Sequence, residues 1–120
     1  LQQSIPATSE SFTPLHRPTI DFRIGDVLKD LPSLLHAPLM MLDTNHDGTF
    51  ERTFVAELER LNYKGIVLCD DIDLNDDMRS FWADIRLPKM DLTSVGHWSG
   101  TGAILFNPDV TTLRLLDQGV

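Results

Sequence analysis

Three aspartates and one histidine stand directly after two short apolar runs of the chain. Asp43 follows the run PLMML, with His46 three residues later, and Asp70 and Asp71 follow the run IVLC. If these runs are neighbouring parallel strands, their carboxyl ends share one edge of a sheet, where open α/β folds bind ligands. Carboxylate oxygens are the ligands that Mg²⁺ and similar ions prefer. The spacing therefore predicts a Mg²⁺ or Mn²⁺ site formed by Asp43, Asp70 and Asp71, with helix capping as the alternative role for a strand-end aspartate.

The stretch DTNHDG suggests a second kind of metal site, a calcium-binding EF-hand loop. Counted from Asp43, its sixth residue is Gly48, as that loop requires. The twelfth residue, which should be a bidentate glutamate, is Phe54, and an apolar run precedes the loop in place of an amphipathic helix. The sequence therefore disfavours an EF-hand.

The elements that must position these residues follow from hydrophobic periodicity. Strand patterns cover residues 20–24, 38–42, 66–69, 90–95 and 103–106, and helical spacing covers 28–35, 50–61 and 78–85. The runs at 38–42 and 66–69 are continuous, which is typical of strands buried on both faces of a parallel sheet. Alternating strands and helices predict an α/β fold with a mainly parallel sheet, helices on its faces and a β-hairpin at its C-terminal end.

Composition bounds the class of protein. The chain has 120 residues, of which 42% are hydrophobic and 23% charged, as in an ordinary globular domain with one core. Its formal net charge of −8 argues against a nucleic acid or an anionic membrane as the partner of this chain. A single cysteine, Cys69, excludes an internal disulfide and favours a reducing compartment, so the predicted location is cytoplasmic. Residues 1–18 are predicted to be a tail or linker, and residues 19–120 a single domain.

Some other conspicuous residues have structural interpretations. Asn75 is suited to cap the helix that follows it, and Cys69 lies in an apolar run where packing is its expected role. Glu51 falls on the polar side of the 50–61 helix. His97 and Trp98, in the last turn, either border an acceptor pocket or are exposed.

The ordered motifs resemble a known family. LMMLDTNHDG, YKGIVLCDDI and GHWSGTGAILF, together with IDFRIGDVL, are similar to the C-terminal half of class I S-adenosylmethionine-dependent methyltransferases. The nearest branch is that of metal-dependent O-methyltransferases related to macrocin O-methyltransferase and cephalosporin hydroxylase-type proteins. The resemblance runs from about Ile20 to Phe106. It implies a Rossmann-like domain that methylates a hydroxyl of a sugar or small natural product.

The resemblance also implies residue roles. It assigns the metal to Asp43, Asp70 and Asp71, and it places His46 where relatives have a base or substrate-contacting group. Either His46 or Asp43 would accept the proton of the acceptor hydroxyl; an exposed turn residue is the alternative interpretation of His46. Asp26 and Val27 correspond to the adenine side of the cofactor site, although a strand-end aspartate is often only a turn former.

One part of the family's pattern is missing. Its first strand and glycine-rich turn should precede Ile20, and residues 1–19 contain no Gly-x-Gly turn after an apolar strand. We therefore expect the first strands of the fold to be absent from this chain and to be supplied by an N-terminal half or a homo-oligomer partner. The alternative is a non-catalytic Rossmann-like binding module that pairs with a partner chain.

Overall fold

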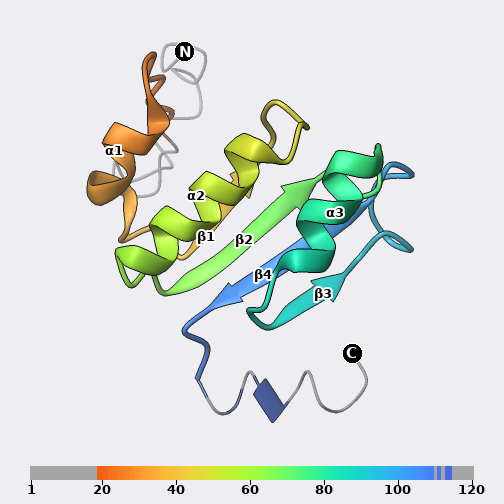
Figure 1. Cartoon of the computed structure of the whole chain (residues 1–120). Coiled ribbons are helices and arrows are strands. Elements are labelled where there is room, and N and C mark those ends of the chain that lie inside the picture. The colour runs from red at the N-terminus through yellow and green to blue at the C-terminus, as the bar shows by residue number, and fades with distance from the viewer. Residues whose placement is uncertain (1–18, 110, 112, 115–120) are drawn as a thin grey trace, which may run out of the picture.

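The computed structural model describes residues 19–109, 111, 113 and 114, and within them the chain is an α/β domain. The elements follow the order α1 (Val27–Leu34), β1 (Leu39–Leu42), α2 (Thr49–Arg60), β2 (Gly65–Asp70), α3 (Asp76–Asp84), β3 (Lys89–Asp91) and β4 (Thr101–Phe106) (Figure 1). The predicted tail at residues 1–18 lies outside the described residues. None of the helices in the described part of the chain is long and apolar enough to span a membrane.

The sheet is mixed, with strand order β1-β2-β4-β3. β1 and β2 are parallel, joined through α2, whereas β4 is antiparallel to both β2 and β3. The prediction of a mainly parallel sheet is therefore wrong. The predicted hairpin makes β4 antiparallel to β3, and β4 also pairs with β2, so two of the three strand pairs in the described sheet are antiparallel. The predicted hairpin at the C-terminal end is present, with a shorter first strand than expected because residues 92–95 belong to the turn.

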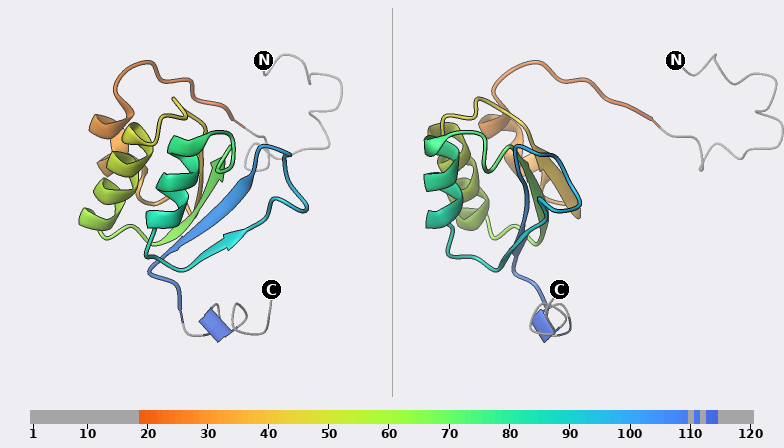
Figure 2. Two further views of the ribbon diagram at one scale, coloured as in Figure 1. Left: turned by 45° about the vertical axis from the view of Figure 1, so that its right-hand side comes forward. Right: turned by 90° about the vertical axis from the view of Figure 1, so that its right-hand side faces the viewer.

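The helices lie together on one side of the sheet. Seen edge-on, α2 and α3 cover the same face, and α1 packs against α2 near β1 (Figure 2). The prediction of helices on both faces is not met in the described residues. The core lies between these helices and the sheet and includes Leu31, Leu42, Phe54, Leu58, Tyr63, Val67, Cys69, Met78, Phe81, Ile104 and Phe106.

β1 forms an open edge of the sheet. Leu39 and Met41 are 56% and 66% exposed, and their neighbour Ile66 on β2 is 40% exposed. These side chains alternate with Met40, Leu42 and Val67, which pack toward the helices. The run at 39–42 is therefore a strand, as predicted, but it is not buried on both faces.

The strand predicted at residues 20–24 is not formed. The segment is irregular, and Ile20, Phe22 and Ile24 are 67%, 81% and 103% exposed. An alternating pattern becomes a strand only when a neighbouring strand accepts its backbone hydrogen bonds. No described strand lies beside this segment.

The starts of the two central helices are set by side-chain caps. The Asp47 carboxylate accepts hydrogen bonds from the backbone N–H groups of Thr49 and Phe50 at 2.9 and 3.3 Å. Asn75 accepts one from the Met78 N–H at 2.8 Å. Both helices therefore begin where the sequence predicted, and Asn75 is confirmed as a cap.

A substitution of Leu58 provides a test of the packing between α2 and the sheet. Its side chain is fully buried, so Leu58→Ala should lower the free energy of unfolding by about 2–5 kcal/mol through lost burial and a residual cavity. Glu59→Ala, at the next, exposed position of the same helix, should change it by less than about 0.5 kcal/mol. Urea denaturation of the two variants checks this, and equal effects would contradict the described packing.

Candidate metal centre

The parallel pairing of β1 and β2 brings two strand ends to one edge of the sheet. Leu42 and Cys69 are paired in register, so Asp43, directly after β1, lies beside Asp70, the last residue of β2. Asp71 follows with a left-handed backbone, φ +61°. Because β4 is antiparallel to β2, its first residue Thr101 pairs with Asp70, and the turn that precedes β4 reaches the same edge.

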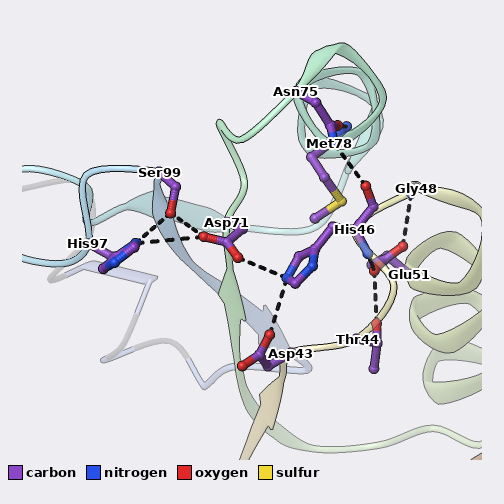
Figure 3. Close-up of polar contacts among 10 residues, drawn as sticks. All are labelled: Asp43, Thr44, His46, Gly48, Glu51, Asp71, Asn75, Met78, His97 and Ser99. Carbon is purple, nitrogen blue, oxygen red and sulfur yellow. Dashed lines mark hydrogen bonds and ion pairs between the residues drawn. The ribbon is translucent and has the colours of Figure 1, made fainter.

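Asp43, His46, Asp70 and Asp71 converge there. One possible ligand atom from each lies within 4.8 Å of the corresponding atoms of the others. His46 Nε2 is 3.1 Å from Asp43 Oδ1 and 2.9 Å from Asp71 Oδ2 (Figure 3). The predicted convergence of the three carboxylates on one edge of the sheet is confirmed.

The histidine nitrogen at the centre of this cluster is unsatisfied. Nε2 is buried although the side chain as a whole is 23% exposed, and it has no aligned hydrogen bond among the described residues. Buried polar atoms are normally hydrogen-bonded. The three carboxylates form a donor set that fits a divalent cation, and the unsatisfied imidazole nitrogen lies beside them.

The loop that carries Asp43 and His46 is held by Glu51. This carboxylate is 1% exposed and accepts hydrogen bonds from Thr44 Oγ1 at 2.8 Å, from the His46 N–H at 2.8 Å and from the Gly48 N–H at 2.9 Å. Its predicted place on the solvent side of α2 is wrong, because the loop folds over the first turn of the helix. The available signal was a glutamate three residues after the N-cap Gly48, the spacing of a capping box.

The same loop is tied to α3 through Asn75. Its Nδ2 donates to the His46 carbonyl at 3.0 Å while its Oδ1 caps the helix (Figure 3). His46 has φ +60°, and Gly48 has φ +81°, so two left-handed residues turn the loop back toward α2. The His46 ring is therefore positioned by two helix starts at once.

Two residues of the last turn surround Asp71. Ser99, which is 1% exposed, donates its hydroxyl to Asp71 Oδ1, and its oxygen is also hydrogen-bonded to His97 Nδ1. His97 Nδ1 lies 3.7 Å from Asp71 Oδ1. Trp98 is 79% exposed. Ser99 was not singled out from the sequence, because its place depends on the antiparallel register of β4.

The electrostatics of the cluster are those of crowded carboxylates. Burial raises the pKa of Asp70, and the negative charges of Asp71 and Asp43 raise it further, against smaller opposing effects of an Asp71 backbone hydrogen bond and His97. Burial raises the pKa of the neighbouring Cys69 thiol to about 12, with a smaller contribution from the charge of Glu51. Cys69 is therefore a packing residue, as predicted.

The residues assigned to the cofactor lie at α1. Asp26 caps this helix, its Oδ1 accepting from the Leu28 N–H at 3.0 Å. Val27 lines a largely apolar pocket of about 460 Å³ between α1, β1 and α2, which extends to Asp43 and Thr44. The predicted cofactor roles of Asp26 and Val27 stay predictions.

The EF-hand alternative does not fit this geometry. Asp43 follows a strand, and Phe54, at the position of the required glutamate, is buried in α2.

No family model, curated protein or solved structure matches the chain. The carboxylate cluster and the sequence motifs around it are therefore the features that bear on the function of the chain.

Asp70 gives the metal-free protein a specific pH dependence. A carboxyl whose pKa is raised by folding destabilises the folded state once it is ionised, so stability falls as pH rises from the ordinary value of 3.8 through the raised one. Asp70→Asn should therefore stabilise the protein at pH 7 in the presence of a chelator, and this gain should shrink at pH 4. Urea denaturation at both pH values measures it.

Asp91 is the matched control of opposite sign. Hydrogen bonds from the Thr93 hydroxyl and N–H lower its pKa, so its contribution to stability is present above the ordinary value of 3.8 and is lost as pH falls through the lowered one. Asp91→Asn should destabilise the protein at pH 7. If Asp70→Asn also destabilised it there, the described crowding would be incorrect.

Proposed function

We propose that this chain carries the metal-binding half of an S-adenosylmethionine-dependent O-methyltransferase. The observation that carries the proposal is the convergence of Asp43, His46, Asp70 and Asp71 at the ends of β1 and β2. Mg²⁺–oxygen distances are about 2.0–2.1 Å, so carboxylates that share one ion must lie within roughly 4–5 Å of each other. The observed 4.8 Å limit meets that requirement.

The donor set favours a hard divalent cation. Carboxylate oxygens suit Mg²⁺ and Mn²⁺, and the exposed Asp43 leaves one side of the cluster open to water or a substrate hydroxyl. Burial raises the pKa of Asp70, and the negative charges of Asp71 and Asp43 raise it further. A bound cation would offset that repulsion.

Methyl transfer to oxygen assigns distinct tasks to these residues. The cofactor would supply the methyl group to the acceptor oxygen with its sulfur as the leaving group, and the hydroxyl proton would pass to a base of this chain. His46 Nε2, which has no hydrogen bond of its own, is the first candidate base, and the Asp43 carboxylate is the second. The metal would orient the acceptor hydroxyl and lower its pKa.

Methyl transfer itself is supported by the resemblance of the motifs and by the surroundings of Asp43. The β1–α2–β2 unit places the cluster at the carboxyl ends of parallel strands, the usual ligand position in open α/β folds. The apolar pocket lined by Val27 adjoins Asp43 and offers room for a small molecule beside the carboxylates. A sugar or small natural product is the proposed acceptor class, and the cytoplasm the proposed location.

A binding module that pairs with another chain is the second candidate function. It is favoured by the face of β1 opposite the helices, where Leu39 and Met41 are exposed, since parallel sheets are usually covered on both faces. In the leading proposal the backbone edge of β1, which ends the described sheet, receives the missing strands of the methyltransferase domain. The two candidates differ in whether the carboxylate cluster binds metal.

Asp71 provides the test of metal binding. Titration of the 120-residue chain with Mn²⁺ in a calorimeter should show one site, and Asp71→Asn should abolish detectable binding because it removes one negative ligand. Asparagine tolerates the left-handed backbone at this position, so thermal unfolding of the variant should show an intact fold.

The control for this titration is Asp84→Asn. Asp84 is exposed and paired with Arg52, outside the cluster, so the same change of charge there should leave the Mn²⁺ affinity unaltered. A wild-type chain that does not bind Mn²⁺, or an Asp71→Asn variant that binds it equally well, would refute the metal centre.

The cofactor is tested separately. Because no glycine-rich turn precedes Ile20, the chain alone should bind S-adenosylmethionine weakly or not at all. Calorimetric titration of a sample that has already passed the Mn²⁺ test measures this. Micromolar affinity for the cofactor would show that the described residues replace the missing turn, and would contradict the half-domain architecture.

A further inference from the structure

A buried hydroxyl links the last turn of the domain to the carboxylate cluster. Ser99 is 1% exposed, and its Oγ lies between Asp71 Oδ1 and His97 Nδ1 (Figure 3). Serine is usually exposed, so a fully buried serine hydroxyl needs its hydrogen-bond partners. Here both partners belong to the edge of the sheet that carries the cluster.

The backbone fixes the position of this hydroxyl. The Asp71 N–H donates to the Gly100 carbonyl at 2.8 Å, and the Asp73 N–H donates to the Ser99 carbonyl at 2.8 Å. Gly100 has φ +103°, and a Cβ there would lie 2.6 Å from the Asp73 nitrogen, so only glycine allows the two turns to approach this closely. Ser99 therefore faces Asp71 before any ligand binds.

The hydrogens of the contact can be assigned. A serine hydroxyl has one hydrogen, and Ser99 donates it to the Asp71 carboxylate. His97 Nδ1 must then donate to Ser99 Oγ, which sets the ring tautomer when the imidazole is neutral. The other ring nitrogen of His97 points away from Asp71 in Figure 3. His97 Nδ1 also lies 3.7 Å from Asp71 Oδ1, but its hydrogen bond is to Ser99, which makes the serine hydroxyl its main connection to the cluster.

The two oxygens of Asp71 consequently have different roles. Oδ1 is held by Ser99, while Oδ2 lies 2.9 Å from His46 Nε2 at the centre of the cluster. A carboxylate with one oxygen anchored cannot rotate freely about its terminal bond, so the second oxygen keeps its direction. Without the anchor, Asp71 would lose this orientation before the cation arrives.

We propose that Ser99 is a positioning residue of the metal centre, which directs Asp71 Oδ2 toward the cation and is itself oriented by His97. This inference rests on the proposed function, because it requires that the cluster bind a metal. Partners that orient a metal ligand typically change metal affinity by about 10–100-fold when they are removed. The expected effect is therefore on binding strength, beyond any effect on stability.

Titration of the full chain with Mn²⁺ alone tests the proposal. Ser99→Ala should raise the Kd by about 10–100-fold, whereas Ser80→Ala, which removes an exposed hydroxyl on α3, should leave it unchanged. Thermal unfolding without metal shows whether each variant is folded. If Ser99→Ala does not fold, Ser99→Cys, which keeps the side-chain shape with a weaker donor, should weaken binding in the same direction.

Substitutions of His97 provide a second test. If Ser99 were only a structural residue, changing His97 would not alter the affinity for Mn²⁺ through it. His97→Ala should weaken Mn²⁺ binding several-fold, and His97→Asn, which can keep a donor near the Nδ1 position, should restore part of it. In the Ser99→Ala background the His97→Ala change should have no further effect, because the two residues act in series.

These experiments distinguish the existence of the metal centre from the role of Ser99 in it. A wild-type chain that does not bind Mn²⁺ overturns the proposed function and this inference with it. A wild-type chain that binds Mn²⁺, together with a folded Ser99→Ala or Ser99→Cys variant of unchanged Kd, overturns the inference alone. Additive effects of the Ser99 and His97 substitutions overturn the proposed action of His97 through Ser99.

Discussion

The parallel register of β1 and β2 is the constraint on which the candidate site depends. Pairing Leu42 with Cys69 brings the ends of both strands to one edge of the sheet, which places Asp43, directly after β1, beside Asp70, the last residue of β2. A shift of one residue would turn the alternate side chains of β1 to the opposite face and expose Leu42 in place of Met41. Burial of the helix-facing residues therefore holds the carboxylates together despite their repulsion.

Local hydrogen bonds then give the edge its shape. Glu51 is a buried carboxylate, yet it accepts hydrogen bonds from three donors of the loop that carries His46, so its charge is well solvated by protein groups. On the other side, the Gly100 turn brings Ser99 to Asp71. Two loops are thus held in place by hydrogen bonds on either side of the cluster. One is the loop at the start of α2, and the other is the turn before β4.

Sequence reasoning succeeded where the determining forces are local. The ends of the apolar runs, the helical stripe through Phe54 and Leu58, and the cap at Asn75 depend on neighbours within a few residues. Sequence reasoning failed where the structure depends on contacts between residues that are not close in the sequence. β4 pairs with β2, which lies far from it in the sequence, and Glu51 is buried by a loop that folds back over it. Ile20 to Ile24 lack a neighbouring strand among the described residues.

The exposed edge of β1 has a consequence for how copies of the chain behave in concentrated solution. Among the described residues β1 pairs with β2 alone, and an edge strand with exposed Leu39 and Met41 is a template for edge-to-edge association. The formal net charge of −8 opposes that association through long-range repulsion between chains, which salt screens. A bound divalent cation would cancel a quarter of this charge, so occupancy of the metal centre and colloidal stability are physically linked in this protein.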